Sequence, residues 1–127
     1  MSNEITIQAS VKLLNGALRR SFEPPAKQVS QTTKAAFEDV VTVGTSEQDL
    51  SLPTNSAVTS SNQSLCQLVN LDSTNFVKLG PKSGGAMVEM LRLYPGVPQI
   101  LELAPSVTLR WIADTAACKV AIQILAK

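Results

Sequence analysis

The side chains that most often carry enzymatic chemistry are scarce in this sequence. Histidine is absent from all 127 residues, which removes the commonest general base and the usual activator of a serine or cysteine nucleophile. Cys66 therefore has no histidine to activate it. Catalysis would have to use carboxylates, lysine or tyrosine. We predict that the protein is not an enzyme and has no catalytic, cofactor-binding or metal-binding residues.

Two glutamates could still be considered as a catalytic pair. Glu89 and Glu102 lie in strand-like segments, and glycosidases place two carboxylates on either side of the scissile bond. Only 4% of the residues are aromatic, which leaves few rings on which a sugar could stack. Solvated strand faces explain both glutamates more simply.

Two polar segments resemble ligand-binding loops. Asp72, Asn70 and Asn75 could offer oxygen ligands to calcium, but they include one carboxylate where hard cations usually take several. Short polar side chains also bond the nearby backbone in tight turns, and we expect that role here. The glycine-rich segment 80–85, GPKSGG, lacks the following helix that a phosphate-binding loop requires.

Charge and hydropathy limit the classes of partner. Eleven basic and ten acidic residues give a net charge of +1, and no segment forms the basic face that nucleic acid requires. The sequence contains no run of eighteen apolar residues, the length that predicts a membrane span. Its first residues do not resemble a signal peptide. We expect a soluble protein made in a cytoplasm, with Cys66 and Cys118 as buried free thiols.

Short apolar segments separated by turn residues predict an all-β fold, a single antiparallel β-sandwich of jelly-roll character that spans residues 1–127 as one domain. The central feature is residues 65–80, where two apolar runs flank a polar turn and indicate a β-hairpin. Further strands are expected at 4–13, 17–22, 37–43, 87–93, 99–103, 108–113 and 118–125.

Other segments are expected to connect these strands. Asn15-Gly16 predicts a two-residue hairpin turn, and Pro95-Gly96 is typical of a type II turn. Residues 26–35 are expected to form a short edge strand or an ordered loop, 45–50 one helical turn, and 53–64 a surface loop.

The final strand is apolar on both faces, with Gln123 as the polar residue inside VAIQILA. Such a strand must be central in its sheet or be covered by a neighbouring subunit. We therefore predict a homo-oligomer.

The order of segments resembles a family of small all-β virion proteins of tailed bacteriophages. The similarity runs from ITIQASVKLLNG through VTVGTSEQDLSL, NLDSTNFVKLG and LRLYPGVPQILEL to ADTAACKVAIQIL, and NLDSTNFVKLG followed by Pro95-Gly96 is its most specific part. The Pro24-Pro25 pair and the segment GPKSGG depart from the pattern of this family.

The resemblance implies a structural component of a virion that is assembled in the host cytoplasm. We favour a capsid decoration (cement) protein that binds the major capsid protein shell as a trimer, by analogy with the three-fold positions of such shells. A tail or head-to-tail connector component is the alternative within the class. Outside it, a ligand-binding or carbohydrate-binding module is the alternative, and exposed Trp or Tyr side chains would distinguish it.

Overall fold

The computed structural model describes residues 4–50 and 57–126, and it contains strands and turns without helix in these ranges. The chain divides into two compact units, residues 1–32 and residues 33–127. We call the described part of the first unit, residues 4–32, the arm, and that of the second the sandwich. The sequence predicted one domain over residues 1–127, whereas the sandwich is built from the second unit by itself.

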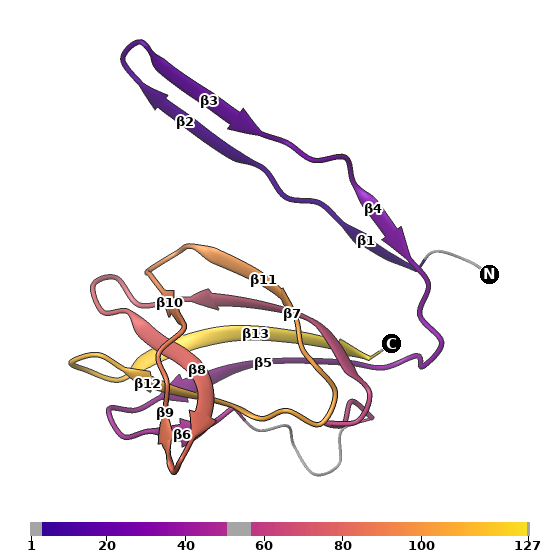
Figure 1. The fold of residues 1–127 in the computed structure, drawn as a ribbon, viewed down its shortest axis with the longest axis vertical. Helices are drawn as coiled ribbons and strands as arrows, with labels where there is room; N and C mark the ends of the chain where they lie inside the picture. The colour runs from indigo at the N-terminus through magenta and orange to yellow at the C-terminus, as the bar shows by residue number, and fades with distance from the viewer. Residues whose placement is uncertain (1–3, 51–56, 127) are drawn as a thin grey trace. The chain divides into compact units, whose positions relative to one another are not determined.

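The sandwich consists of two antiparallel sheets (Figure 1). The first sheet contains, in spatial order, β11 (Pro98–Glu102), β7 (Gln63–Asn70), β13 (Cys118–Ala126) and β5 (Ala36–Val43). The second contains β10 (Leu91–Leu93), β8 (Val77–Ser83), β12 (Leu109–Ala113) and β6 (Gln48–Asp49), and the short β9 (Ala86–Met87) also pairs with β8.

The way in which the chain alternates between the sheets defines a jelly roll. When β9 is left out, the remaining strands from β5 to β13 can be numbered 1 to 8 along the chain. Strands 1, 3, 6 and 8 then form the first sheet, and strands 2, 4, 5 and 7 form the second. Their spatial orders, 6-3-8-1 and 5-4-7-2, are those of two interleaved Greek keys. The all-β sandwich of jelly-roll character that the sequence predicted is confirmed.

The core lies between the two sheets and consists mainly of aliphatic side chains. Alternate residues of β13 are buried, and β13 pairs with β5 on one side and β7 on the other. The final strand is therefore central, the first of the two alternatives that its apolar sequence left open. The largest fully buried apolar side chains include Trp111, Leu68, Leu79, Leu93, Ile124, Val43 and Val58.

The prediction of a hairpin over residues 65–80 is wrong. β7 pairs with β11 and β13, whereas β8 pairs with β10, β12 and β9, so the two strands belong to opposite sheets. Residues 71–76 carry the chain across the sandwich. Because each strand has one face in the core, the same apolar pattern suits a crossing between sheets as well as a hairpin.

Three other local predictions in the sandwich need correction. Residues 45–50 form no helical turn: Gln48 and Asp49 pair with β12, and Leu50 N–H donates to Leu109 C=O at 2.8 Å. The hydrogen bonds to β12 outweigh the local preference of this short segment for a helical turn. The strand expected over 87–93 is interrupted between β9 and β10. Of the loop expected over 53–64, residues 53–56 lie outside the described residues and 63–64 already belong to β7.

A bulge between β9 and β10, opposite Gly80 of β8, interrupts the strand expected over 87–93. Val88 N–H donates to Pro81 C=O at 2.8 Å and Met90 N–H donates to Leu79 C=O at 3.0 Å, so the chain between them bows against Gly80. A Cβ atom added to Gly80 would lie 1.8 Å from the carbonyl oxygen of Val88. The bulge therefore requires glycine at this position.

The turn at Pro95-Gly96 has the predicted type II form. Val97 N–H donates to Tyr94 C=O at 3.2 Å, which places Pro95 and Gly96 at the two central positions. Gly96 has φ +74°, the left-handed conformation that the second central position of this turn needs.

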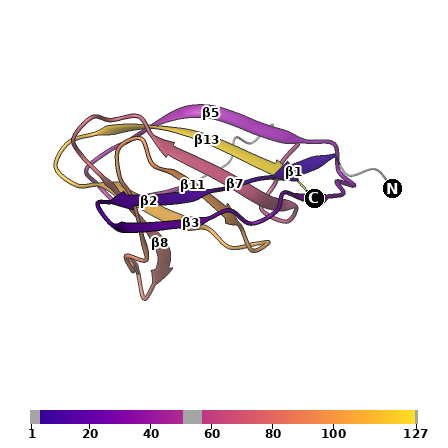
Figure 2. The same cartoon turned by 90° about the horizontal axis from the view of Figure 1, so that it is seen from above.

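The arm is a two-stranded ribbon (Figures 1 and 2). β1 (Ile5–Ile7) pairs with β4 (Lys27–Val29), and β2 (Val11–Asn15) pairs with β3 (Leu18–Phe22). The single strand predicted over 4–13 is wrong, because residues 8–10 leave the ladder near Pro24-Pro25, and prolines cannot donate to it.

The hairpin turn of the arm lies one residue later than predicted. Asn15 pairs with Leu18, so the two turn residues are Gly16 and Ala17, and Gly16 has φ +57°. Glycine with a positive φ at the first turn position matches the twist of the flanking strands.

Candidate functional site: interaction surfaces

The two glutamates that could have formed a glycosidase pair lie in different surroundings. Glu89 precedes β10 of the second sheet and forms an ion pair with Arg92. Glu102 ends β11 of the first sheet and accepts a hydrogen bond from the Ser64 hydroxyl at 3.3 Å. The two carboxylates therefore have separate partners in separate sheets.

The polar turn after β7 is held by its own side chains. Asn70 is fully buried, and its Nδ2 donates to the carbonyl oxygens of Asn75 at 2.8 Å and Leu93 at 2.9 Å. Its Oδ1 accepts from Asp72 N–H at 2.9 Å. Asp72 Oδ2 in turn accepts from the backbone N–H groups of Thr74 at 3.0 Å and Asn75 at 2.6 Å.

These bonds confirm a turn stabilised by its own side chains, because the Asp72 carboxylate is engaged by the backbone. Within residues 4–50 and 57–126, no three or more His, Cys, Asp or Glu side chains gather closely enough to hold a metal ion.

Asp72 should make the stability of the fold depend on pH. The backbone N–H groups of Asn75 and Thr74 hold the pKa of Asp72 below its ordinary value of 3.8. A carboxyl whose pKa is lower in the folded chain stabilises the fold above its unfolded pKa, and that contribution is lost as the pH falls through the folded value. We expect Asp72→Ala to lower the melting temperature at neutral pH, and the gap from the wild type to shrink below pH 3.8.

Thermal melts across this range check the prediction. Ser73→Ala, which changes an exposed side chain of the same turn without a titratable group, should show a small difference from the wild type that does not vary with pH. A gap for Asp72→Ala that stays constant into acid would contradict the assignment.

Both cysteine thiols are free and buried. Burial raises the pKa of Cys66 to about 12 and also raises the pKa of Cys118, with Asp72 and Asp114 contributing at the second site. Because the thiolate is the nucleophilic form, both cysteines are suited to packing rather than to chemistry.

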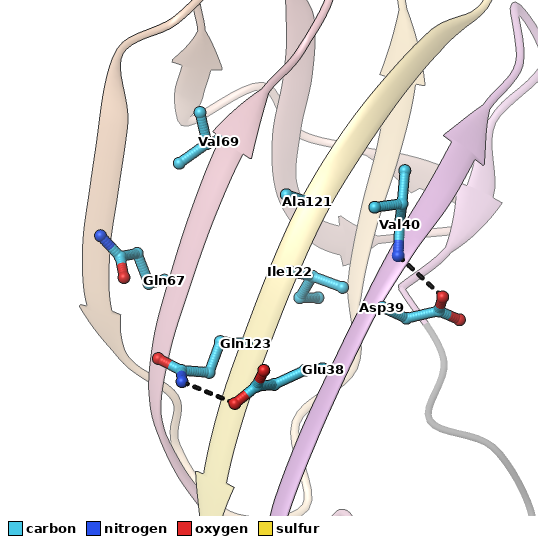
Figure 3. Close-up of a pocket in the computed structure, with 8 residues that line it drawn as sticks. All are labelled: Glu38, Asp39, Val40, Gln67, Val69, Ala121, Ile122 and Gln123. Carbon is cyan, nitrogen blue, oxygen red and sulfur yellow. Dashed lines mark hydrogen bonds between the residues drawn. The ribbon is translucent and has the colours of Figure 1, made fainter.

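The outer face of the first sheet carries a shallow hollow of about 570 Å³. One row across the strands is apolar, with Val40, Ala121 and Val69, and the next is polar, with Glu38, Gln123 and Gln67 (Figure 3).

The polar row of this hollow is partly tied to itself. Gln123 Nε2 donates to Glu38 Oε1 at 3.0 Å, and at the edge of the hollow Asp39 Oδ1 accepts from Val40 N–H at 2.7 Å. Such a broad, mixed face is suited to another protein more than to a small molecule.

A second hollow, which we call the apolar cleft, opens into the side of the sandwich between β11 and the second sheet, with a volume of about 480 Å³. Leu91, Leu101, Leu103 and Leu109 are partly buried in its wall and also pack against the core. Met90, Val107, Pro81 and Ala104 complete the apolar lining, and Glu102 is its charged residue. The hydrophobic core therefore reaches the surface here.

The arm presents a third surface, the apolar arm face. Directly paired residues of β2 and β3 share a face, which places the pairs Val11–Phe22 and Leu13–Arg20 on the same side as Leu18. The exposed fractions on this face are 68% for Val11, 44% for Leu13, 45% for Leu18 and 70% for Phe22. The opposite side carries Lys12, Leu14, Arg19 and Ser21.

The sequence missed the exposure of the arm. Alternation in residues 4–13 predicted a half-buried strand, and every residue of β2 and β3 is exposed. A signal was present in Arg19 and Arg20, because two adjacent arginines place one charge on each side of a strand. A strand with a charge on both sides is difficult to bury in a sandwich.

Aromatic side chains give little support to sugar binding. Trp111 is 2% exposed in the core, and Tyr94, 49% exposed, packs against Phe76 with ring centroids 5.5 Å apart. Arg92 lies over the same Phe76 ring at 4.6 Å.

The chain matches no family model, no curated protein and no solved structure. In the part of the chain that the structure describes, no helix has the length and hydropathy to cross a membrane.

Proposed function

We propose that the protein is a non-enzymatic structural component of a tailed-bacteriophage virion, and that it is a capsid decoration protein that binds the major capsid protein shell as a homo-oligomer, with a trimer favoured. The observation that supports an assembly role is the apolar arm face, because soluble monomers rarely leave several large apolar side chains together in water.

The fold supports this proposal by analogy. Jelly rolls are common among viral capsid domains, but lectins and cupins share them, so the architecture is compatible with several functions. The buried Trp111 and the packed Tyr94 favour assembly over carbohydrate binding. Many weak, equivalent contacts on a shell would give avidity to a domain of this size.

Labelling of purified virions tests the proposal. An antibody against the protein should decorate the head surface in many copies, and mass spectrometry of the same particles should detect the chain. Label confined to the tail or to the neck would replace the decoration role with the tail or connector alternative. Absence from particles, when the protein is abundant in infected cells, would overturn the virion assignment.

A further inference from the structure

Two apolar surfaces on this chain have complementary character. The apolar arm face is a narrow ridge of four large side chains on a ribbon two strands wide. The apolar cleft is a concave opening into the core, lined by four partly buried leucines with the more exposed Met90 and Val107 at its surface. A ridge and a cleft of the same chemistry are suited to each other.

The arm needs a cover to be stable. A two-stranded ribbon by itself is marginally stable in water, because neither face has a second layer to pack against. Burying most of the four side chains would remove their apolar surface from water, which stabilises the docked arm. The arm is therefore expected to keep its shape by docking its apolar face on another surface.

Charge favours the sandwich as that surface. Residues 4–32 contain four basic and two acidic residues, a net charge of +2, whereas residues 33–126 contain six basic and eight acidic residues, a net charge of −2. Locally, Arg20 lies on the apolar arm face and Glu102 lines the cleft. An arm placed in the cleft would bring these opposite charges together.

Reach favours the sandwich of a second copy. One row across the first sheet contains Phe37, Ile124, Cys66 and Leu101. Because Leu101 belongs to the wall of the cleft, the cleft lies about three strand spacings, roughly 14 Å, from the start of β5. Leu18 lies about eleven residues before the end of β4, or roughly 36 Å of extended chain. The chain length from the end of β4 to the apolar arm face therefore exceeds the distance from β5 to the cleft, and it is long enough for the arm to reach a second copy.

We propose that the apolar arm face of one copy docks in the apolar cleft of a second copy. Arm and cleft are different surfaces, so the contact is head-to-tail, and it closes into a ring when the rotation between copies allows it. This inference deepens the self-association in the proposed function and identifies the surfaces that carry it.

Paired cysteine variants test the docking in the full-length protein. Leu18→Cys, on the apolar arm face, is co-expressed with a tagged Val107→Cys chain, so that the tag separates mixed dimers from dimers of one variant. Native Cys66 and Cys118 are buried and remain in place. Under a mild oxidant we expect a mixed disulfide dimer.

The matched control is Leu14→Cys with the same tagged Val107→Cys chain. Leu14 is a leucine of the same hairpin, 75% exposed, on the opposite side of the arm. We expect at least ten-fold less mixed dimer from this pair. Equal yields from both pairs, or no mixed dimer from either, would each overturn the proposal.

Light scattering coupled to size exclusion provides the second measurement. Phe22→Ser should convert the oligomer to a monomer, whereas Leu14→Ser should leave its mass unchanged. Both experiments use purified protein without phage particles, so the docking can fail while the virion assignment stands, and the reverse also holds.

Discussion

Replacing Gly80 with alanine should lower the free energy of unfolding by about 3 kcal/mol or more, because the new Cβ cannot be placed without moving backbone. Its ideal position lies 1.8 Å from the carbonyl oxygen of Val88 and 3.0 Å from Met90 N. Both atoms belong to the bulge between β9 and β10, and Gly80 is buried in β8. The substitution must displace the bulge or β8.

Gly44→Ala is the matched control. Gly44 follows β5, and an added Cβ would lie 3.6 Å from the flexible Gln48 side chain, an ordinary contact. This variant should stay within about 1 kcal/mol of the wild type. Urea unfolding of the three proteins compares their midpoints, and equal midpoints for the two variants would show that the bulge does not approach β8 closely.

Asn70→Ala should lower the free energy of unfolding by about 2 to 4 kcal/mol, since it removes three hydrogen bonds and leaves the Leu93 carbonyl without the amide that satisfies it inside the protein. The amide of Asn70 joins β7, the crossing segment and the end of β10. Its loss loosens the segment that connects the two sheets.

Thr74→Ala, in the same segment, is the control for this variant. The Thr74 hydroxyl is exposed and lies 3.4 Å from Asp72 Oδ2, so its removal should cost no more than about 0.5 kcal/mol. Chemical unfolding followed by the fluorescence of the buried Trp111 measures both. Similar losses from the two variants would mean that the buried amide does not hold the crossing.

The positions of most strands could be predicted from the sequence because alternation of apolar and polar residues reports the burial of one face. β5, β11, β12 and β13 lie within a residue or two of the expected segments. Strand partners are a different question. Alternation says that a face is apolar but not which strand lies beside it, so the same pattern over residues 65–80 was compatible with a hairpin and with a crossing.

The interaction surfaces were harder to predict for the same reason. Alternation at Val11 and Leu13 indicated an apolar face, and the natural expectation was a core behind it. In the structure this face belongs to a ribbon without a second layer of its own. The apolar cleft is formed by Leu91, Leu101 and Leu109 from three separate strands, and no local pattern reports that they share one opening.

Asp39 has a consequence for how copies of this protein can polymerise. It lies on β5, an edge strand, and its exposed carboxylate accepts the N–H of Val40. A charged side chain on an edge strand makes that edge a poor template for further strand pairing, and Pro98 starts β11 at the opposite edge of the same sheet. In the second sheet, the edge strands β10 and β6 have only three and two residues. Edge-to-edge pairing of one sandwich with another, a route to amyloid-like fibres, is therefore disfavoured.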